Sequence, residues 1–326
     1  MSRNICLTAV EGQTGFLVAE LLMKESKFSS QVDSLTGLTM NPSAPKIKEL
    51  ESLGVNVVTH KPGRERAVIT TLKQTGCDTI CLIPPTRLDK CEITLELVHA
   101  AKKAGVPSVL LISSAGCDYA DPVRQPRLRQ FIDIETAMLS TKGDTGTATG
   151  HSVCIIRAGF YAENLLLYSE QAKVESVLPL PIGESNKFAP VALGNVPHLA
   201  AHVLAGKDRT RRKRKFADRS SVPVYLGPLL YAGDELPEAA SKAIGATLDF
   251  ENIPISEAKR ILSVQSESDK LEQEYILDYY SLVREGKTNY VATTAFQFVT
   301  GVQATEPDEF FKLYAAELRP RKKVKA

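Results

Sequence analysis

The sequence predicts an α/β fold: a doubly wound parallel sheet followed by a smaller, mostly helical C-terminal domain. Over the first 160 residues, short apolar runs rich in β-branched side chains alternate with patterns of helical period, as strands and crossover helices do in such sheets. Beyond Gly159 this alternation stops and helical patterns dominate. The 326 residues also exceed one domain of about 150 residues, which favours two domains, over residues 1–160 and 161–326.

Six strands are expected in the first domain, and turn residues separate them from the helices. Gly54 and Gly105 end two helices, because glycine readily adopts the left-handed conformation of a C-cap. Pro84 and Pro85 end the fourth strand, since proline has no N–H group to donate. The stretch 142–151, with three glycines and three threonines, is typical of a surface loop. The strands are expected at 5–10, 34–39, 55–59, 79–83, 109–112 and 153–157, and the helices at 14–27, 46–53, 66–75, 89–103 and 127–140.

The second half of the chain is expected to contain loops and helices. The proline-rich stretch 178–181 and the following Gly183 predict a loop-rich region. Segments near 190–206 and 222–228 are expected to return to the first domain. Helices are expected at 196–204, 235–243, 256–262, 269–283 and 308–318.

The most informative stretch is Gly12-Gln13-Thr14-Gly15, between the first predicted strand and the first predicted helix. Glycine at such a turn tolerates positive φ and lets the backbone approach a phosphate closely. The N–H groups that open the helix, up to Phe16 and Leu17, would face that phosphate at the positive end of the helix dipole. A third glycine, which serves helix–strand packing, is expected at position 18, where the chain has Val18. Two glycines often mark a plain turn, but their place directly after an N-terminal strand predicts dinucleotide binding.

Composition argues against several classes of protein. No run approaches the roughly 20 apolar residues of a membrane span, and residues 1–4 lead into a strand without a signal peptide. Six scattered cysteines form no Cys-x-x-Cys pair, which indicates reduced thiols in an intracellular protein. His198 and His202 stand four apart on a predicted helix, but no third ligand follows in a recognised pattern, so no metal site is expected.

The chain contains two strongly basic runs, and its remaining residues have a net negative charge. The run 209–215 holds six cations in seven residues, and the tail 319–325 holds five more. The whole chain has 40 basic and 38 acidic residues and carries a net charge of +2. Without these eleven basic residues, the rest of the chain carries a net charge of −9. The run 209–215 is consistent with a solvated loop, a nuclear import signal or a nucleic-acid contact. Without a recognition helix or zinc finger, specific nucleic-acid binding is not expected. The protein is expected in the cytoplasm, or in the nucleus if the run directs import.

Nine short motifs are spread along nearly the whole chain: Gly12–Gly15, Leu38–Pro42, Leu82–Pro85, Leu111–Gly116, Ile134–Glu135, Arg157–Leu165, Lys187–Val191, Tyr225–Pro228 and Ala243–Gly245. Their order and spacing resemble the NmrA-like family, an atypical branch of the extended short-chain dehydrogenases. The resemblance implies a Rossmann-type domain over residues 1–160, with NADP in its cleft, and a small C-terminal domain forming the other wall. The family includes redox sensors, transcriptional co-regulators and reductases, so the fold alone does not decide the function.

At the adenosine end of the cofactor, the sequence departs from the family. The second strand ends without the carboxylate that holds the ribose of NAD, which favours NADP, but Met40 stands where the family has arginine. Lys46 or Lys48 could approach a 2′-phosphate, or both could be solvated charges, and Lys61 replaces an aspartate near the adenine. NADP is the expected cofactor, NAD is less favoured, and loss of the cofactor is an alternative. The expected cofactor residues are Gly12, Gln13, Thr14, Gly15, Phe16, Leu17, Thr39, Met40, Asn41, Lys46, Ile83, Pro84, Pro85, Ser113, Ser114, Phe160 and Tyr161.

A proton donor for hydride chemistry is missing from the expected positions. None of the ten tyrosines is followed four residues later by lysine, the pair that lowers a tyrosine pKa in this fold. Reductases of the NmrA-like branch instead use lysine or histidine three residues before the Ile-Glu pair, and that residue is Phe131. Arg129 nearby keeps its charge and is a poor donor. Ser114 and Tyr161 remain the candidate catalytic residues.

Three hypotheses follow from these residues. The favoured one is a regulator that senses NADP and binds a protein partner through its C-terminal half, because the proton donor is missing. The second is an NADPH-dependent reductase of a small carbonyl, quinone or aryl-ether compound bound in the cleft. The third is a scaffold that has lost the nucleotide. A monomer or a homodimer is compatible with each.

Overall fold

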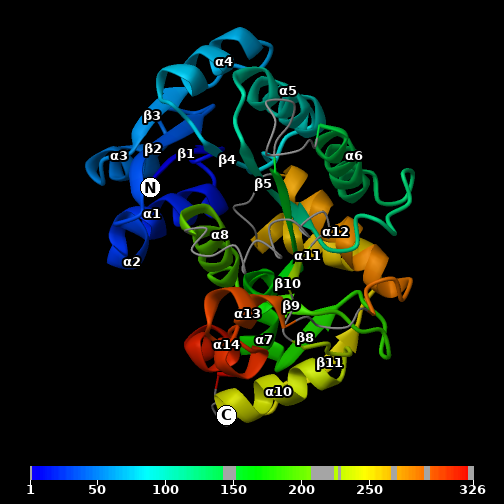
Figure 1. The fold of residues 1–326 in the computed structure, drawn as a ribbon. Coiled ribbons are helices and arrows are strands. Elements are labelled where there is room, and N and C mark those ends of the chain that lie inside the picture. The colour runs from blue at the N-terminus through cyan, green and yellow to red at the C-terminus, as the bar shows by residue number, and fades with distance from the viewer. Residues whose placement is uncertain are drawn as a thin grey trace.

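The fold is built on one parallel sheet. In a computed structural model, which describes residues 2–141, 152–206, 224–226, 229–265, 270–289 and 294–321, seven strands lie in the order β10-β6-β5-β4-β1-β2-β3 (Figure 1). Every neighbouring pair in that order is parallel, so the predicted doubly wound α/β fold is confirmed. The strands are β1 (Arg3–Thr8), β2 (Val32–Thr39), β3 (Asn56–Thr59), β4 (Thr79–Leu82), β5 (Ser108–Ser114), β6 (Ser152–Ala158) and β10 (Val224–Leu226).

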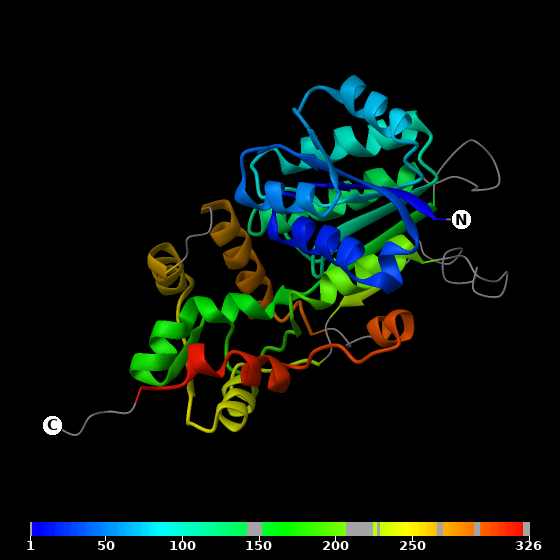
Figure 2. The ribbon, with the colours of Figure 1, turned by 90° about the vertical axis from the view of Figure 1, so that its left-hand side faces the viewer.

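Helices cover both faces of the sheet, each over its own hydrophobic core (Figures 1 and 2). On one face the core includes Leu22, Leu50 and Leu199, and on the other it includes Leu72, Val98 and Met138. The helices of the first face are α1 (Gln13–Lys24), α2 (Ser26–Ser29), α3 (Pro45–Ser52), α8 (Asn195–Ala205) and α13 (Ala295–Thr300), and those of the second are α4 (Glu65–Gln74), α5 (Lys90–Ala104) and α6 (Pro126–Ser140).

A third core lies beyond the sheet, among the elements coloured green to red at one end of the molecule (Figure 2). Aromatic rings form its centre: the ring centroid of Phe160 lies 5.5 Å from that of Phe188 and 5.2 Å from that of Tyr280. The helices around it are η1 (Ala162–Tyr168), α7 (Ser169–Glu175), α10 (Glu235–Ile244), α11 (Ile255–Gln265), α12 (Lys270–Arg284), α14 (Pro307–Leu313) and α15 (Ala315–Leu318).

Short strands accompany this third core, and one of them corrects a sequence-based expectation. The stretch 178–181 was expected in a loop, but β8 (Val177–Leu180) pairs in parallel with β11 (Asp249–Asn252). Pro179 is tolerated because a two-stranded sheet leaves each strand an unpaired edge, where a missing N–H group breaks no ladder bond. A second pair, β7 (Phe160–Tyr161) with β9 (Pro190–Val191), leads the chain from the sheet into the third core.

Some expectations fall on residues outside the described ranges, namely the loop 142–151, the basic run 209–215 and the tail beyond 321. Within the described ranges, every helix is too short or too polar to cross a bilayer. The same residues contain no group of three or more His, Cys, Asp or Glu side chains placed to hold a metal ion.

The glycine motif of the turn after β1 begins three residues earlier than the sequence analysis predicted. Gly12 is the N-cap of α1, and a Cβ added to Gly15 would lie only 2.4 Å from the carbonyl oxygen of Ala9. Gly15 is therefore the glycine that lets the helix pack on the strand, and Val18 is an ordinary core residue, fully buried. Ala9 adopts φ +49°, the left-handed conformation that favours glycine. The pattern is thus Ala9-x-x-Gly12-x-x-Gly15, in which the first glycine is replaced and the third is present.

The close approach at Gly15 predicts a large loss of stability on substitution. Gly15→Ala should lower the free energy of unfolding by about 1–3 kcal/mol, because the new methyl group can be accommodated only if backbone moves. Urea denaturation of the nucleotide-free protein, followed by circular dichroism, measures it. Gly194→Ala is the matched control, since nothing lies within 4 Å of the added Cβ, and it should cost less than about 1 kcal/mol. Equal losses in the two variants would contradict the assignment.

Candidate functional site

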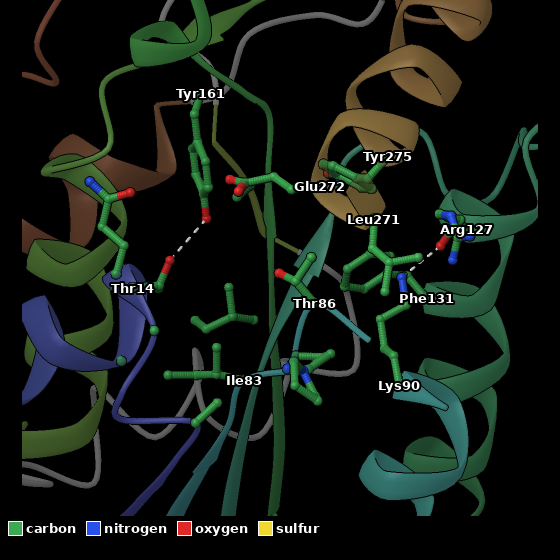
Figure 3. A pocket seen from close by; sticks show the side chains of 18 of the residues that line it. Thr14, Ile83, Thr86, Lys90, Arg127, Phe131, Tyr161, Leu271, Glu272 and Tyr275 are labelled. Carbon is green, nitrogen blue, oxygen red and sulfur yellow. Dashed lines mark hydrogen bonds between the residues drawn. The ribbon is translucent and has the colours of Figure 1, made fainter. Parts of the chain in front are cut away.

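A cavity of about 350 Å³ lies at the carboxyl ends of the central strands. β1, β4, β5 and β6 end there, next to the point where the strand order reverses, which is where open α/β sheets bind their ligands. A side-chain bond fixes two of these ends: Thr8 Oγ1 accepts a hydrogen bond of 2.8 Å from the N–H of Ile83. Helix α12 forms the opposite wall through Leu271, Glu272 and Tyr275 (Figure 3).

The turn Gly12–Gly15, called the phosphate turn below, lines one side of this cavity. Gly12, Gln13, Thr14 and Gly15 all contribute, and Gly12 and Gln13 are exposed. The first turn of α1 contains no acidic residue, and no side chain caps it. Its opening N–H groups are therefore available for an anion at the positive end of the helix dipole. On the same side of the cavity, the hydroxyl of Tyr161 lies 3.5 Å from that of Thr14 (Figure 3).

A carboxylate and a lysine flank the end of β2, where dinucleotide-binding proteins hold the adenosine ribose. Glu11 accepts a 3.1 Å hydrogen bond from the N–H of Met40, and its other carboxylate oxygen is buried without a partner among the described residues. The ammonium group of Lys46 lies 5.6 Å from the ring centroid of Phe16 in α1, so this lysine reaches toward the turn. Lys48 is exposed. Lys46 and Met40 were named from the sequence for this end of the cofactor, and Glu11 was not.

A buried ion pair supports the end of β5. Arg157 of β6 donates two hydrogen bonds to Glu135 of α6, of 2.9 Å from Nε and 2.7 Å from Nη2. Ser113 donates to the same carboxylate at 2.5 Å, and Asp118 forms a further ion pair of 2.8 Å with Arg157. The Ile134–Glu135 and Arg157–Leu165 motifs are therefore two halves of one interaction. Because its hydroxyl is engaged in this way, Ser113 contributes to the wall of the cavity without a free donor.

The two proposed catalytic residues occupy different places. Tyr161 lines the cavity, but burial raises the pKa of its hydroxyl, which makes it a weaker proton donor. Ser114 is buried, does not line the cavity, and shares a 2.6 Å hydrogen bond with the hydroxyl of Tyr275. Burial raises the pKa of Tyr275 as well. The arrangement therefore activates neither Ser114 nor Tyr161 as a proton donor.

The other expected cofactor residues divide into two groups. Ile83, Pro84 and Pro85 line the cavity. Phe160 instead belongs to the third core, and Phe16 and Leu17 pack against the core under α1. Thr39 is fully buried, and Asn41 accepts a 2.8 Å hydrogen bond from Ser43 at an exposed turn. These last five residues do not reach the cavity.

Lys90 is a charged residue of the cavity that the sequence analysis did not name. It is the first residue of α5, it is only 7% exposed, and it lines the cavity. Its ammonium group donates a 2.7 Å hydrogen bond to the carbonyl of Arg127 and lies 4.1 Å from the ring centroid of Phe131 (Figure 3). Burial, and after it the Arg127 guanidinium, lower the pKa of Lys90 to about 8. In the sequence, a lysine at the start of a helix looks like an ordinary solvated charge.

Comparison with known proteins places this geometry in a family. The sequence profile of the NmrA-like family matches residues 1–320. The chain belongs to the NmrA-like family. The resemblance seen in the nine motifs is thereby confirmed, and in this NmrA-like protein the motifs at Gly12–Gly15 and Leu82–Pro85 both border the cavity.

Individual relatives of this NmrA-like chain have different activities. An NAD(P)H azoreductase of Xenophilus azovorans is 24% identical over 309 residues, 94% of this chain and 97% of the relative. An NADPH-dependent quinone oxidoreductase of Escherichia coli, solved with NADPH, superposes with a TM-score of 0.74 at 20% identity, over 95% of this chain and 99% of that one. NmrA itself, a negative transcriptional regulator solved with NADP, gives 0.69 at 11% identity, over 95% and 94%. At such identities the solved structures establish the fold alone.

The buried ion pair predicts an asymmetric response to mutation. Arg157→Met should lower the free energy of unfolding by about 3–5 kcal/mol, because it leaves the Glu135 carboxylate buried without its partner. The double variant Arg157→Met/Glu135→Leu should lose less. Thermal and urea denaturation measure these changes.

Arg129→Met is the control for this prediction, since its contact with Asp133, on the same helix as Glu135, is exposed and 4.0 Å long. It should change the stability by less than about 0.5 kcal/mol. If Arg157→Met were as mild as this control, the buried pair would not have the structural role assigned to it.

Proposed function

We propose that this protein binds NADP(H) along the phosphate turn and reduces a small, flat carbonyl or quinone compound in the adjoining cavity. The observation that carries the proposal is the position of the cavity, which extends from Gly12–Gly15 to an aromatic wall formed by Phe131 and Tyr275. A nucleotide on the turn would therefore leave room for a second, apolar ligand against that wall. Residues 1–160 would hold the nucleotide, and residues from 161 onward, α12 among them, would enclose the substrate.

The residues of the site fit such a cofactor. Exposed glycine backbone and uncapped N–H groups at the start of α1 suit a pyrophosphate. At the other end, Lys46 would supply the cation for a 2′-phosphate, whereas the carboxylate of Glu11 would repel that phosphate. Bound NADPH would supply a hydride, and the protein would supply the orientation of the substrate and one proton. The activities of the azoreductase and the quinone oxidoreductase to which the chain is similar support this reaction class.

A second candidate is a regulator that senses NADP without turning over a substrate. The contact between Thr14 and Tyr161 favours it, because it connects the phosphate turn to β7, where the chain enters the third core. A nucleotide on the turn would change that contact, and the change could reach a protein partner bound to the C-terminal half. The similarity to NmrA supports this candidate. Saturable NADP binding without oxidation of NADPH in the presence of substrates would favour it over the reductase.

Charge at the phosphate turn provides the direct test of nucleotide binding. Calorimetry should detect binding of NADPH, and Gln13→Glu should weaken it about tenfold or more, because the new carboxylate faces the phosphates at the helix N-terminus. Gln74→Glu, at the exposed end of α4, is the control and should change nothing. NADPH should then be oxidised in the presence of a benzoquinone, a naphthoquinone or an azo dye. Absence of heat with NADPH, NADP⁺, NADH and NAD⁺ would refute the proposal.

Lys46 predicts which dinucleotide is preferred. Lys46→Ala should weaken NADPH binding about tenfold and leave NADH binding unchanged, since only NADPH carries the 2′-phosphate that this ammonium group would meet. Lys48→Ala, two residues away on the exposed side of α3, should affect neither nucleotide. Calorimetric titration of each variant with both nucleotides makes the comparison. Equal losses for NADPH and NADH would place Lys46 elsewhere than at the 2′-phosphate.

A further inference from the structure

Lys90 has an environment that is unusual for a lysine. Its side chain crosses from the start of α5 to α6, where Nζ donates to the carbonyl of Arg127, and the ring centroid of Tyr275 on α12 lies 5.9 Å from Nζ. Within the described residues, no carboxylate lies within salt-bridge distance of Nζ. A buried ammonium group without an ion pair is costly, and its place at a helix N-terminus is also unfavourable for a cation. Such a residue in a ligand cavity is a functional candidate.

The ammonium group of Lys90 lies beside the residue at which the family resemblance implies a proton donor. The family resemblance places a lysine or histidine at residue 131, where this chain has Phe131. The ammonium group of Lys90 lies 4.1 Å from the centroid of that phenylalanine ring. In this chain the cation therefore comes from Lys90 of α5, and the ring of Phe131 on the neighbouring helix α6 provides the apolar surface beside it. Both residues line the same cavity, so the ammonium group borders the space left for the substrate.

We propose that Lys90 is the catalytic proton donor of this protein and takes over, from helix α5, the role that the family resemblance implies for residue 131 on helix α6. This inference rests on the proposed reductase function. When a hydride reaches the carbonyl or quinone, one oxygen of the substrate gains a negative charge and the C=O double bond becomes single. Lys90 Nζ gives that oxygen one proton, is left as a neutral amine, and regains a proton from water. The net reaction consumes one hydride and one proton for each substrate molecule.

The surroundings of Lys90 suit this cycle. The charged and titratable groups that influence it are Arg127 of α6, Asp278 and Tyr275 of α12, Cys91 of α5, and Cys117, which precedes α6. Burial and Arg127 favour the neutral amine, whereas Asp278, Cys91 and Cys117 favour the ammonium form. With a pKa of about 8, Lys90 is mostly protonated at neutral pH and loses its proton readily. The activity should therefore fall as the pH rises through about 8, because the donor is then deprotonated.

Relocation of the lysine is the sharpest test of the assignment. Lys90→Met should lower kcat for quinone reduction by about 10²–10⁴-fold and abolish the decline in activity near pH 8, while calorimetry shows unchanged NADPH affinity. The double variant Lys90→Met/Phe131→Lys should recover part of the lost kcat, because it returns the donor to α6. Lys102→Met, on the exposed side of the same helix, is the control and should behave like the wild type.

A binding measurement tests Lys90 without turnover. The phenolate of 4-nitrophenol resembles the anionic form of a reduced quinone, and its absorbance distinguishes it from the neutral phenol. In the presence of NADP⁺, the wild-type protein should bind the phenolate at least about tenfold more tightly than Lys90→Met does, since a charge-assisted hydrogen bond is lost. Phe131→Lys in the Lys90→Met background should restore phenolate binding. If wild type and Lys90→Met bind the phenolate equally, or if neither binds it, Lys90 is not the donor.

The two proposals fail in different ways. Absence of nucleotide binding to the wild type refutes the proposed function. Nucleotide binding and turnover that are the same in wild type and Lys90→Met, with the same pH profile, refute only the role of Lys90. Circular dichroism and thermal denaturation of Lys90→Met show whether a loss of activity comes from misfolding. The stability of this variant should be unchanged or higher, because the substitution removes a buried charge without an ion pair.

Discussion

The buried pair of Glu135 and Arg157 is the interaction on which the site depends. It joins α6 to β6 and, through Ser113, to the end of β5, so three elements meet at one carboxylate that is only 1% exposed. Desolvation of two charges is costly, and the pair compensates through two parallel hydrogen bonds and the additional contact with Asp118. α6 is thereby held in register against the sheet. That register determines where Phe131 and the carbonyl of Arg127 lie, and hence where the ammonium group of Lys90 rests.

The cavity lies in the crevice that open α/β sheets form at the carboxyl ends of their strands, and its opposite wall comes from α12, far along the chain. The strand order reverses beside β1, so the loops after β1 and β4 separate and leave a crevice at the carboxyl ends. α12 closes this crevice from the opposite side, about 150 residues after β5. The turn Gly12–Gly15 thus lies at the carboxyl edge of the sheet, whereas the opposite wall of the cavity belongs to the third core.

The sequence predicted the sheet and the phosphate turn well, because both depend on local patterns. Alternating apolar runs and helix-ending glycines gave the strand and helix positions, and two glycines after an N-terminal strand located the turn. The register of that turn was wrong, since only a measured approach, Gly15 to the carbonyl of Ala9, shows which glycine packs the helix. Lys90 was missed for a related reason: burial, the absence of a carboxylate partner among the described residues, and contact with Phe131 are properties of packing between helices. The spacing of residues within a single helix or strand cannot reveal such contacts.

The two ends of the cleft draw on separate parts of the chain. Glu11 contacts Met40 just after β2, and Lys46 of α3 lies over the ring of Phe16, whereas Lys90 and Phe131 lie at the junction of α5 and α6. The residues proposed to choose between nucleotides and those proposed to serve the reaction therefore share neither a helix nor a loop. A substitution at one end leaves the packing of the other intact, so the two properties can diverge independently in evolution. A single fold can in this way carry oxidoreductases of different specificity and regulators without a reaction.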